Sequence, residues 1–218
     1  MAKIEAIIYD LDGVITDTAE YHFLAWKTLA DELHIPFDRA FNEQLKGLSR
    51  IDSLNLILEQ GSKSYTEKEK EQLAAKKNEH YQTLIRKISP DDLLPGVEAF
   101  MKEVKQAGIK TGLASASKNA QTVIQKLEIT DLLDTVVDAA EVKRGKPDPE
   151  VFLTAAEQLG ANPDNCIGIE DARSGVAAIK SAGMFAVGIG DRETLSRADW
   201  IIEDSSLLSL SLLKQKYD

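Results

Sequence analysis

The sequence has a single cysteine, Cys166, among its 218 residues, and it lacks any hydrophobic run that could cross a bilayer. One cysteine cannot form an internal disulfide, and a membrane helix needs about 20 consecutive apolar residues. Met1 leads directly into a strand-like run, without the basic start and apolar stretch of a signal peptide. We therefore expect a cytoplasmic protein that does not insert into a membrane.

Positive charge is also scarce, since 26 lysines and arginines face 36 aspartates and glutamates, which gives a formal net charge of -10. This charge disfavours nucleic acids and anionic membranes as partners. An anionic substrate would need locally clustered basic residues, so the positions of the few lysines and arginines are informative. The apolar fraction of 43% is that of a globular chain rather than a disordered one.

Short apolar runs alternate with helical segments over most of the chain. The strands that we expect lie at residues 6–9, 110–114, 135–137, 166–169, 185–189 and 200–202. This alternation predicts the α/β fold class, with a doubly wound parallel sheet. We assign residues 1–15 and 93–218 to this core.

Between the first two strands the sequence carries only helical periodicity. The helical segments are residues 19–33, 41–60 and 66–88. We interpret residues 16–92 as an inserted helical cap.

Thr66 followed by Glu69 predicts a capping box at the start of the last long helix. Lys77 falls on the same inward stripe of that helix as Tyr81, so it is either a snorkelling lysine or a basic group that faces an anion.

Two acids, Asp10 and Asp12, follow the first predicted strand, and Gly13 permits a sharp turn after them. Ligands of doubly wound sheets bind beyond the carboxyl ends of the strands. Two like charges ~4 Å apart repel by roughly 4 kcal/mol at an effective dielectric of ~20, so this pair needs a counter-ion or a raised pKa. The alternative is an Asp-rich turn in which Asp12 or Thr16 caps a helix.

Two further acids, Glu170 and Asp171, follow the predicted strand at residues 166–169 and reach the same edge of the sheet. Together with Asp10 and Asp12 they form a set of hard oxygen ligands without a neighbouring histidine or cysteine. Such a set favours Mg²⁺. In the alternative, Glu170 and Asp171 only cap the helix that comes next.

Polar groups also follow two other predicted strands. The strand at residues 110–114 leads into a cluster that opens a helix: Ser115, Ser117, Lys118 and Asn119. Hydroxyls and backbone N–H groups at a helix start bind anions, although serine and asparagine are also ordinary N-caps. Lys146 lies in a loop stiffened by two prolines, after the strand at residues 135–137. This lysine either binds a phosphate or is a solvated surface residue.

These four motifs, with a helical insert after the first, resemble the haloacid dehalogenase superfamily of phosphotransferases over essentially the whole chain. The resemblance implies a nucleophile at Asp10 and a general acid/base at Asp12. It also implies that Ser115 and Lys146 hold the phosphoryl group that is transferred. The residues implied to bind Mg²⁺ are Asp10, Asp12 through its backbone carbonyl, Asp171, and Glu170 as a ligand or close neighbour.

More closely, residues 10–22, 45–50 and 114–119 resemble members that interconvert β-D-glucose 1-phosphate and D-glucose 6-phosphate through β-glucose 1,6-bisphosphate. The resemblance implies a site for the distal phosphate, formed by Arg50, Ser117, Lys118 and Asn119. It further implies that the sugar or Asp12 is contacted by Thr18, His22, Lys46, Gly47 and Lys77. The expected partner is a small sugar phosphate, and we expect a monomer.

Two other functions fit part of the sequence. A sugar-phosphate phosphatase of the same superfamily shares every core residue and differs in whether water reaches the aspartyl phosphate. The residues implied to bind a distal phosphate favour the mutase. A signalling module of the receiver type is also doubly wound and acidic, but it accepts phosphate after its third strand. Residues 138–139 offer no matching acidic pocket there, and signalling leaves the inserted cap unexplained.

Overall fold

The computed structural model describes residues 3–217, and the chain divides into two compact units. The first unit comprises Met1–Asp17 and Ile88–Asp218, and the second comprises Thr18–Lys87. The boundaries expected from the sequence lie after residues 15 and 92, and residues 1–2 and 218 of the expected core lie outside the described part. Among the described residues, no helix is both long and apolar enough to span a membrane.

Within residues 3–217, the first unit contains a six-stranded sheet in the order β3-β2-β1-β4-β5-β6, and all pairings are parallel. The strands are β1 (Ala6–Tyr9), β2 (Lys110–Leu113), β3 (Thr135–Val136), β4 (Cys166–Glu170), β5 (Phe185–Ile189) and β6 (Trp200–Ile202). The prediction of a doubly wound parallel sheet is confirmed. The strand order reverses at β1, so the carboxyl end of β1 is the switch point beyond which ligands bind in such sheets.

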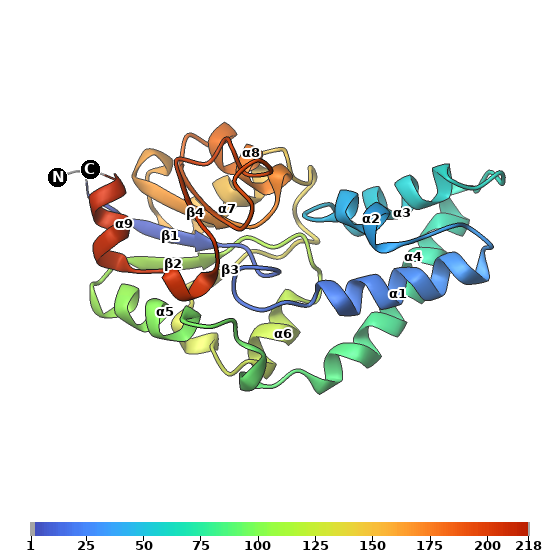
Figure 1. Ribbon diagram of the computed structural model, residues 1–218, viewed down its shortest axis with the longest axis horizontal. Helices are drawn as coiled ribbons and strands as arrows, with labels where there is room; N and C mark the ends of the chain where they lie inside the picture. Colours follow the sequence, from blue (N-terminus) through green and yellow to red (C-terminus); the bar gives the residue numbers. More distant parts are fainter. Residues whose placement is uncertain (1–2, 218) are drawn as a thin grey trace. The chain divides into compact units, whose positions relative to one another are not determined.

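Helices cover both faces of this sheet (Figure 1). They are α5 (Val97–Gln106), α6 (Ala120–Lys126), α7 (Glu150–Leu159), α8 (Arg173–Ser181) and α9 (Leu210–Tyr217). Short 3-10 turns lie at Pro90–Asp92, Thr130–Leu132, Pro163–Asn165 and Ser205–Leu207. Successive side chains of β1 point to opposite faces. Ile8 therefore packs beneath α7 and α8, whereas Tyr9 meets Phe100 of α5 with 6.3 Å between ring centroids.

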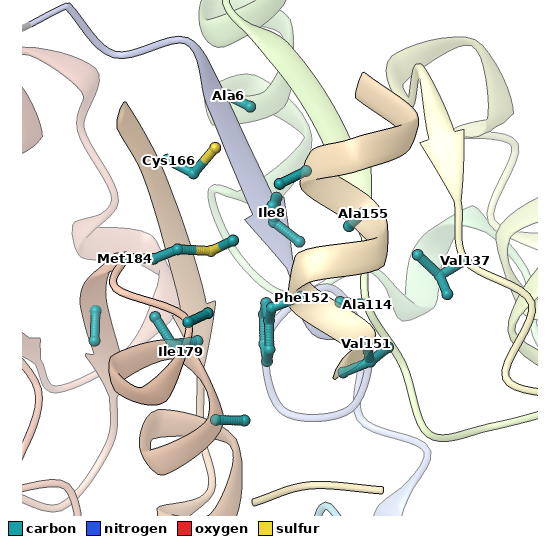
Figure 2. Packing of buried hydrophobic residues seen from close by; sticks show 14 of the residues in the cluster. Ala6, Ile8, Ala114, Val137, Val151, Phe152, Ala155, Cys166, Ile179 and Met184 are labelled. Atoms are coloured by element: carbon teal, nitrogen blue, oxygen red, sulfur yellow. The ribbon is translucent and has the colours of Figure 1, made fainter. Parts of the chain in front are cut away.

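The core between the sheet and helices α7 and α8 is apolar and tightly filled (Figure 2). Phe152 of α7 and Ile179 of α8 are fully buried against Ile8 and its neighbours. Burial of each such side chain contributes roughly 1.5–3 kcal/mol relative to its exposure. This packing gives the loops at the carboxyl ends of β1 and β4 a rigid support.

The second unit is helical. It contains α1 (Ala19–Glu32), α2 (Arg39–Asn42), α3 (Arg50–Glu59) and α4 (Glu67–Leu84), with 3-10 turns at Glu43–Leu45 and Ile85–Lys87. Helix α4 packs against α1 and α3. The Thr66 capping box is confirmed, because the Thr66 hydroxyl accepts from the backbone N–H of Glu69 and the Glu69 carboxylate accepts from the backbone N–H of Thr66. The helical segment expected over residues 41–60 is interrupted between residues 45 and 50: Gly47 has φ +74°, and Ser49 begins a new helix by accepting from the backbone N–H of Asp52.

Candidate active site

Three acidic side chains meet beyond the carboxyl ends of β1 and β4. The backbone N–H of Asp10 donates to the carbonyl of Ile169 at 2.9 Å, which continues the pairing past the end of β1 and sets Asp10 beside Glu170. Carboxylate oxygens of Asp10, Glu170 and Asp171 all lie within 4.8 Å of one another. The structure therefore brings together three of the four acids expected at this edge.

Lys146 lies between two of these acids. Its Nζ donates to Asp10 Oδ1 and to Glu170 Oε2, each at 2.7 Å, and the side chain is almost fully buried. Burial opposes the charged form, but the two carboxylates outweigh it and raise the pKa of Lys146 above its usual range. Lys146 is therefore not a solvated surface lysine. The peptide bond between Lys146 and Pro147 is cis.

Glu170 is the most enclosed acid of the site, with none of its surface exposed. Burial, followed by the negative charge of Asp10, raises its pKa to about 7, against the opposing effect of Lys146. Its Oε1 accepts from the backbone N–H groups of Asp171 at 3.1 Å and Ala172 at 3.2 Å. Glu170 thus binds the backbone ahead of α8 through one oxygen and Lys146 through the other, so it is more than a helix cap.

The side chains in the turn after Asp10 do not cap a helix. Helix α1 begins after Thr18, whose side chain makes no capping bond, while the hydroxyl of Thr16 donates to the carbonyl of Asp92 at 2.7 Å. The alternative in which Asp12 or Thr16 caps a helix is therefore wrong. Gly13 has φ +72° and sits so close to Asp171 that a Cβ would lie 2.3 Å from Oδ2. The Asp12 carboxylate lies outside the cluster of three acids.

The residues of this cluster fit a divalent cation. When all three carboxylates are ionised, the ammonium of Lys146 balances only one of their charges, and the two that remain in a largely buried space favour a compensating ion. Carboxylate oxygens are ligands of hard cations such as Mg²⁺. Asp10 and Asp171 would hold the ion from β1 and β4, with Glu170 beside them.

The polar cluster after β2 lies at the same edge of the sheet. The backbone N–H of Ala114 donates to the carbonyl of Tyr9 at 2.8 Å, so Ser115 follows a strand end next to that of β1. Ser115 is buried, and its hydroxyl accepts from the backbone N–H of Ser117 at 3.1 Å. The hydroxyl of Ser117 in turn accepts from the backbone of Asn119, and this asparagine is buried without a side-chain capping bond. Lys118 is exposed.

In the helical unit, the structure pairs Lys77 of α4 with His22 of α1. Lys77 is 2% exposed, so it faces inward and the snorkelling alternative is wrong. Its Nζ lies 2.7 Å from His22 Nδ1. Burial, then the charges of Lys77 and Arg50, hold the pKa of His22 well below its usual value.

The helical unit also contains the remaining residues that were expected to contact the substrate. Arg50 is the first residue of α3, and partial burial lowers the pKa of its guanidinium. Lys46 forms an ion pair with Glu43 at 2.9 Å, and Gly47 supplies the left-handed turn before α3. Thr18 is fully buried.

Two residues that matter to these arrangements received no specific role from the sequence. Gly175 leaves room for Glu170, since a Cβ there would lie 1.8 Å from Oε2. Tyr81 stacks on His22. The sequence pattern put Tyr81 on the same helical stripe as Lys77, which was the available signal for it. Gly175 carried no signal beyond close helix packing.

Comparison with known proteins adds independent findings. The sequence model of the haloacid dehalogenase-like hydrolase family matches residues 4–183. The chain is 50% identical over 217 residues to the beta-phosphoglucomutase of Bacillus subtilis, covering 99% of this chain and 96% of that one. It also resembles the crystal structure of a beta-phosphoglucomutase from Clostridium difficile, with a TM-score of 0.96, 50% identity and coverage of 98% and 97%. A phosphorylated carbohydrates phosphatase of Thermotoga maritima is 30% identical over 184 residues, covering 83% of this chain and 82% of that protein.

Proposed function

The chain belongs to the haloacid dehalogenase-like hydrolase family, and we propose that it is an isomerase with β-phosphoglucomutase activity. It interconverts β-D-glucose 1-phosphate and D-glucose 6-phosphate through β-glucose 1,6-bisphosphate. The observation that carries this proposal is the 50% identity to a beta-phosphoglucomutase over 99% of the chain, compared with 30% to the phosphatase. A cytoplasmic location and a monomeric state remain predictions.

The first half of the proposed reaction forms an aspartyl phosphate. A carboxylate oxygen of Asp10 attacks phosphorus, a new P–O bond forms, and the bond between phosphorus and the sugar oxygen breaks. Asp12 gives its proton to the departing sugar oxygen and takes a proton from the attacking hydroxyl in the reverse direction. Lys146 holds Asp10 in place through the bond at 2.7 Å, and the Ser115 hydroxyl binds a phosphoryl oxygen.

We further propose that the cation held by Asp10, Asp171 and Glu170 is Mg²⁺, with the backbone carbonyl of Asp12 as another ligand. When bound, this ion neutralises negative charge on the nucleophile and the phosphoryl oxygens. Lys146 balances only part of the negative charge of Asp10 and Glu170, and the ion would balance the part that remains. The phosphoryl group would approach a site whose negative charge is already balanced.

A mutase must also bind the phosphate that is not being transferred. We propose that the second phosphate is bound by Arg50, Ser117, Lys118 and Asn119. A guanidinium can make two parallel hydrogen bonds to a phosphate, which suits Arg50 to this purpose. The sugar would be contacted by Thr18, His22, Lys46, Gly47 and Lys77. These contacts orient the bisphosphate so that either of its phosphates can be presented to Asp10.

An assay with purified protein tests the activity. Protein with Mg²⁺, β-D-glucose 1-phosphate and a trace of β-glucose 1,6-bisphosphate should form glucose 6-phosphate with little inorganic phosphate. Release of inorganic phosphate at a comparable rate would instead support a sugar-phosphate phosphatase, in which water takes the phosphoryl group from Asp10.

A second experiment tests the roles of the residues. The Asp10→Asn variant should carry no covalent phosphate when mass spectrometry is performed after incubation with the bisphosphate. Phosphate found on that variant would overturn the assignment of the nucleophile. The Arg50→Ala variant should lower the mutase rate more than the rate at which acetyl phosphate, which has no distal phosphate, phosphorylates Asp10.

A further inference from the structure

Two buried aromatic side chains surround the ammonium of Lys77 inside the helical unit. The Nζ of Lys77 lies 4.5 Å from the ring centroid of Trp26 and 4.8 Å from that of Tyr81. Trp26 is 3% exposed and Tyr81 is 1% exposed. Aromatic faces attract cations, most strongly where water is excluded. Trp26 of α1 and Tyr81 of α4 thus hold the charged end of Lys77 between the two helices.

The position of this ammonium decides which nitrogen of His22 carries the proton. An ammonium has only donors, so at 2.7 Å the Nδ1 of His22 must accept a hydrogen bond from Lys77. A neutral imidazole that accepts at Nδ1 carries its proton on Nε2. His22 therefore offers an N–H donor at Nε2, which suits an oxygen of a sugar phosphate.

Tyr81 contacts three residues that the proposed function assigns to the substrate. Its ring stacks on His22, with centroids 4.1 Å apart and planes inclined by 26°. Its hydroxyl donates to Thr18 Oγ1 at 3.1 Å, and its face lies under the ammonium of Lys77. The stack limits rotation of the imidazole, while the hydroxyl bond ties α4 to the first residue of the unit.

We propose that Tyr81 is a positioning residue, which keeps His22 in the Nε2–H tautomer and holds the His22–Lys77 pair ready to bind the sugar phosphate. This inference rests on the proposed function, because His22, Lys77 and Thr18 contact substrate only there. Tyr81 itself acts through these three residues. Loss of the ring frees the imidazole to rotate, and loss of the hydroxyl alone frees only Thr18.

The first test reads the tautomer of His22 directly and needs no substrate. In ¹⁵N NMR of the full chain, the wild type and Tyr81→Phe should show a protonated Nε2 and an unprotonated Nδ1. Tyr81→Leu should show averaged signals from both tautomers, as should Lys77→Met, which removes the donor to Nδ1. The matched control is Tyr65→Leu, which removes another tyrosine of the unit that contacts a lysine, Lys63. It should resemble the wild type.

The second test separates positioning from a general loss of structure. Tyr81→Leu should lower kcat/KM for the mutase reaction at least tenfold, and Tyr81→Phe about fivefold, which corresponds to one lost hydrogen bond of ~1 kcal/mol. Phosphorylation of Asp10 by acetyl phosphate, which contains no sugar, should proceed at the wild-type rate in both variants. Tyr65→Leu should leave both rates unchanged. If Tyr81→Leu does not fold, Tyr81→Met replaces it in both tests, because methionine keeps more of the volume.

An unchanged His22 tautomer in the folded Tyr81→Leu protein would overturn the proposal. So would an equal loss of the mutase and acetyl phosphate reactions. Failure of the proposed function is distinguishable from these outcomes. A wild-type protein that does not convert β-D-glucose 1-phosphate would contradict the function, whereas the NMR measurement would still decide whether Tyr81 sets the tautomer.

Discussion

Gly175 at the start of α8 lies against Glu170 at the end of β4, so that a Cβ at position 175 would be 1.8 Å from Glu170 Oε2. That oxygen is the one that accepts from Lys146 at 2.7 Å. The backbone of α8 therefore forms one wall of the acid cluster. A side chain of any size at this position must displace Glu170 or the helix.

Gly175→Ala should accordingly disturb both stability and activity. Overpacking of this kind costs about 1–3 kcal/mol, and the loss of the Lys146 bond should lower the rate of Asp10 phosphorylation at least tenfold. Thermal unfolding and a phosphorylation assay check the two effects. Gly112→Ala is the control, because a Cβ there would crowd Leu159 and Thr135 at 3.1 and 3.2 Å, away from the acids. Gly112→Ala should lower the stability but not the rate of Asp10 phosphorylation. An equal loss of this rate in both variants would contradict a specific effect of Gly175 on Glu170.

Lys146→Met should unfold more easily than the wild type when no divalent cation is present. Removal of the ammonium leaves Asp10 and Glu170 buried without compensation, and breaking a buried pair costs about 3 kcal/mol or more. Urea denaturation in EDTA measures the loss. Lys180→Met removes a more exposed lysine that pairs with Asp199, and it should change the free energy of unfolding by less than about 1 kcal/mol. Similar losses in both variants would argue against a buried ion cluster.

Binding of Mg²⁺ should stabilise the wild-type protein and should require Asp171. A cation that binds only the folded state raises the melting temperature as its concentration increases. For Asp171→Asn, the affinity measured by calorimetry should fall at least tenfold, since one anionic ligand is lost. Asp131→Asn alters an exposed aspartate and serves as the control. Unchanged affinity in Asp171→Asn would place the ion elsewhere.

The pH dependence of stability should depend on His22, whose pKa is lowered in the folded protein by burial and by Lys77 and Arg50. As pH falls below about 6.5, the unfolded chain takes up a proton that folded His22 resists, so the free energy of unfolding decreases. The contribution of His22 is therefore present at neutral pH and is lost toward the lowered folded pKa. His22→Gln should lose less stability than the wild type between pH 7 and pH 5, measured by urea denaturation. His34→Asn, which removes an exposed histidine, is the control. If His22→Gln lost as much free energy of unfolding as the wild type between pH 7 and pH 5, the prediction would be contradicted.

Local patterns in the sequence were enough to predict the strands, the parallel sheet and the position of the acids at the strand ends. Apolar runs and turn residues specify such elements through a few neighbouring positions of the chain. The periodicity of residues 41–60 indicated helix but did not reveal the break within it, because Gly47 permits a left-handed turn and Ser49 starts a new helix through a local cap. The resemblance to a family supplied the roles of Asp10 and Lys146.

Only the tertiary structure decided which groups touch. Lys146, in the loop after β3, reaches Asp10 across 136 positions of sequence. Glu170 lies beside Asp10 because the strand order sets β4 next to β1, and this order is a property of the whole sheet. The contact of Gly175 with Glu170 and the stack of Tyr81 on His22 likewise depend on how helices pack. Sequence periodicity indicates which face of a helix is buried, but the partner of that face is chosen by packing of the folded chain.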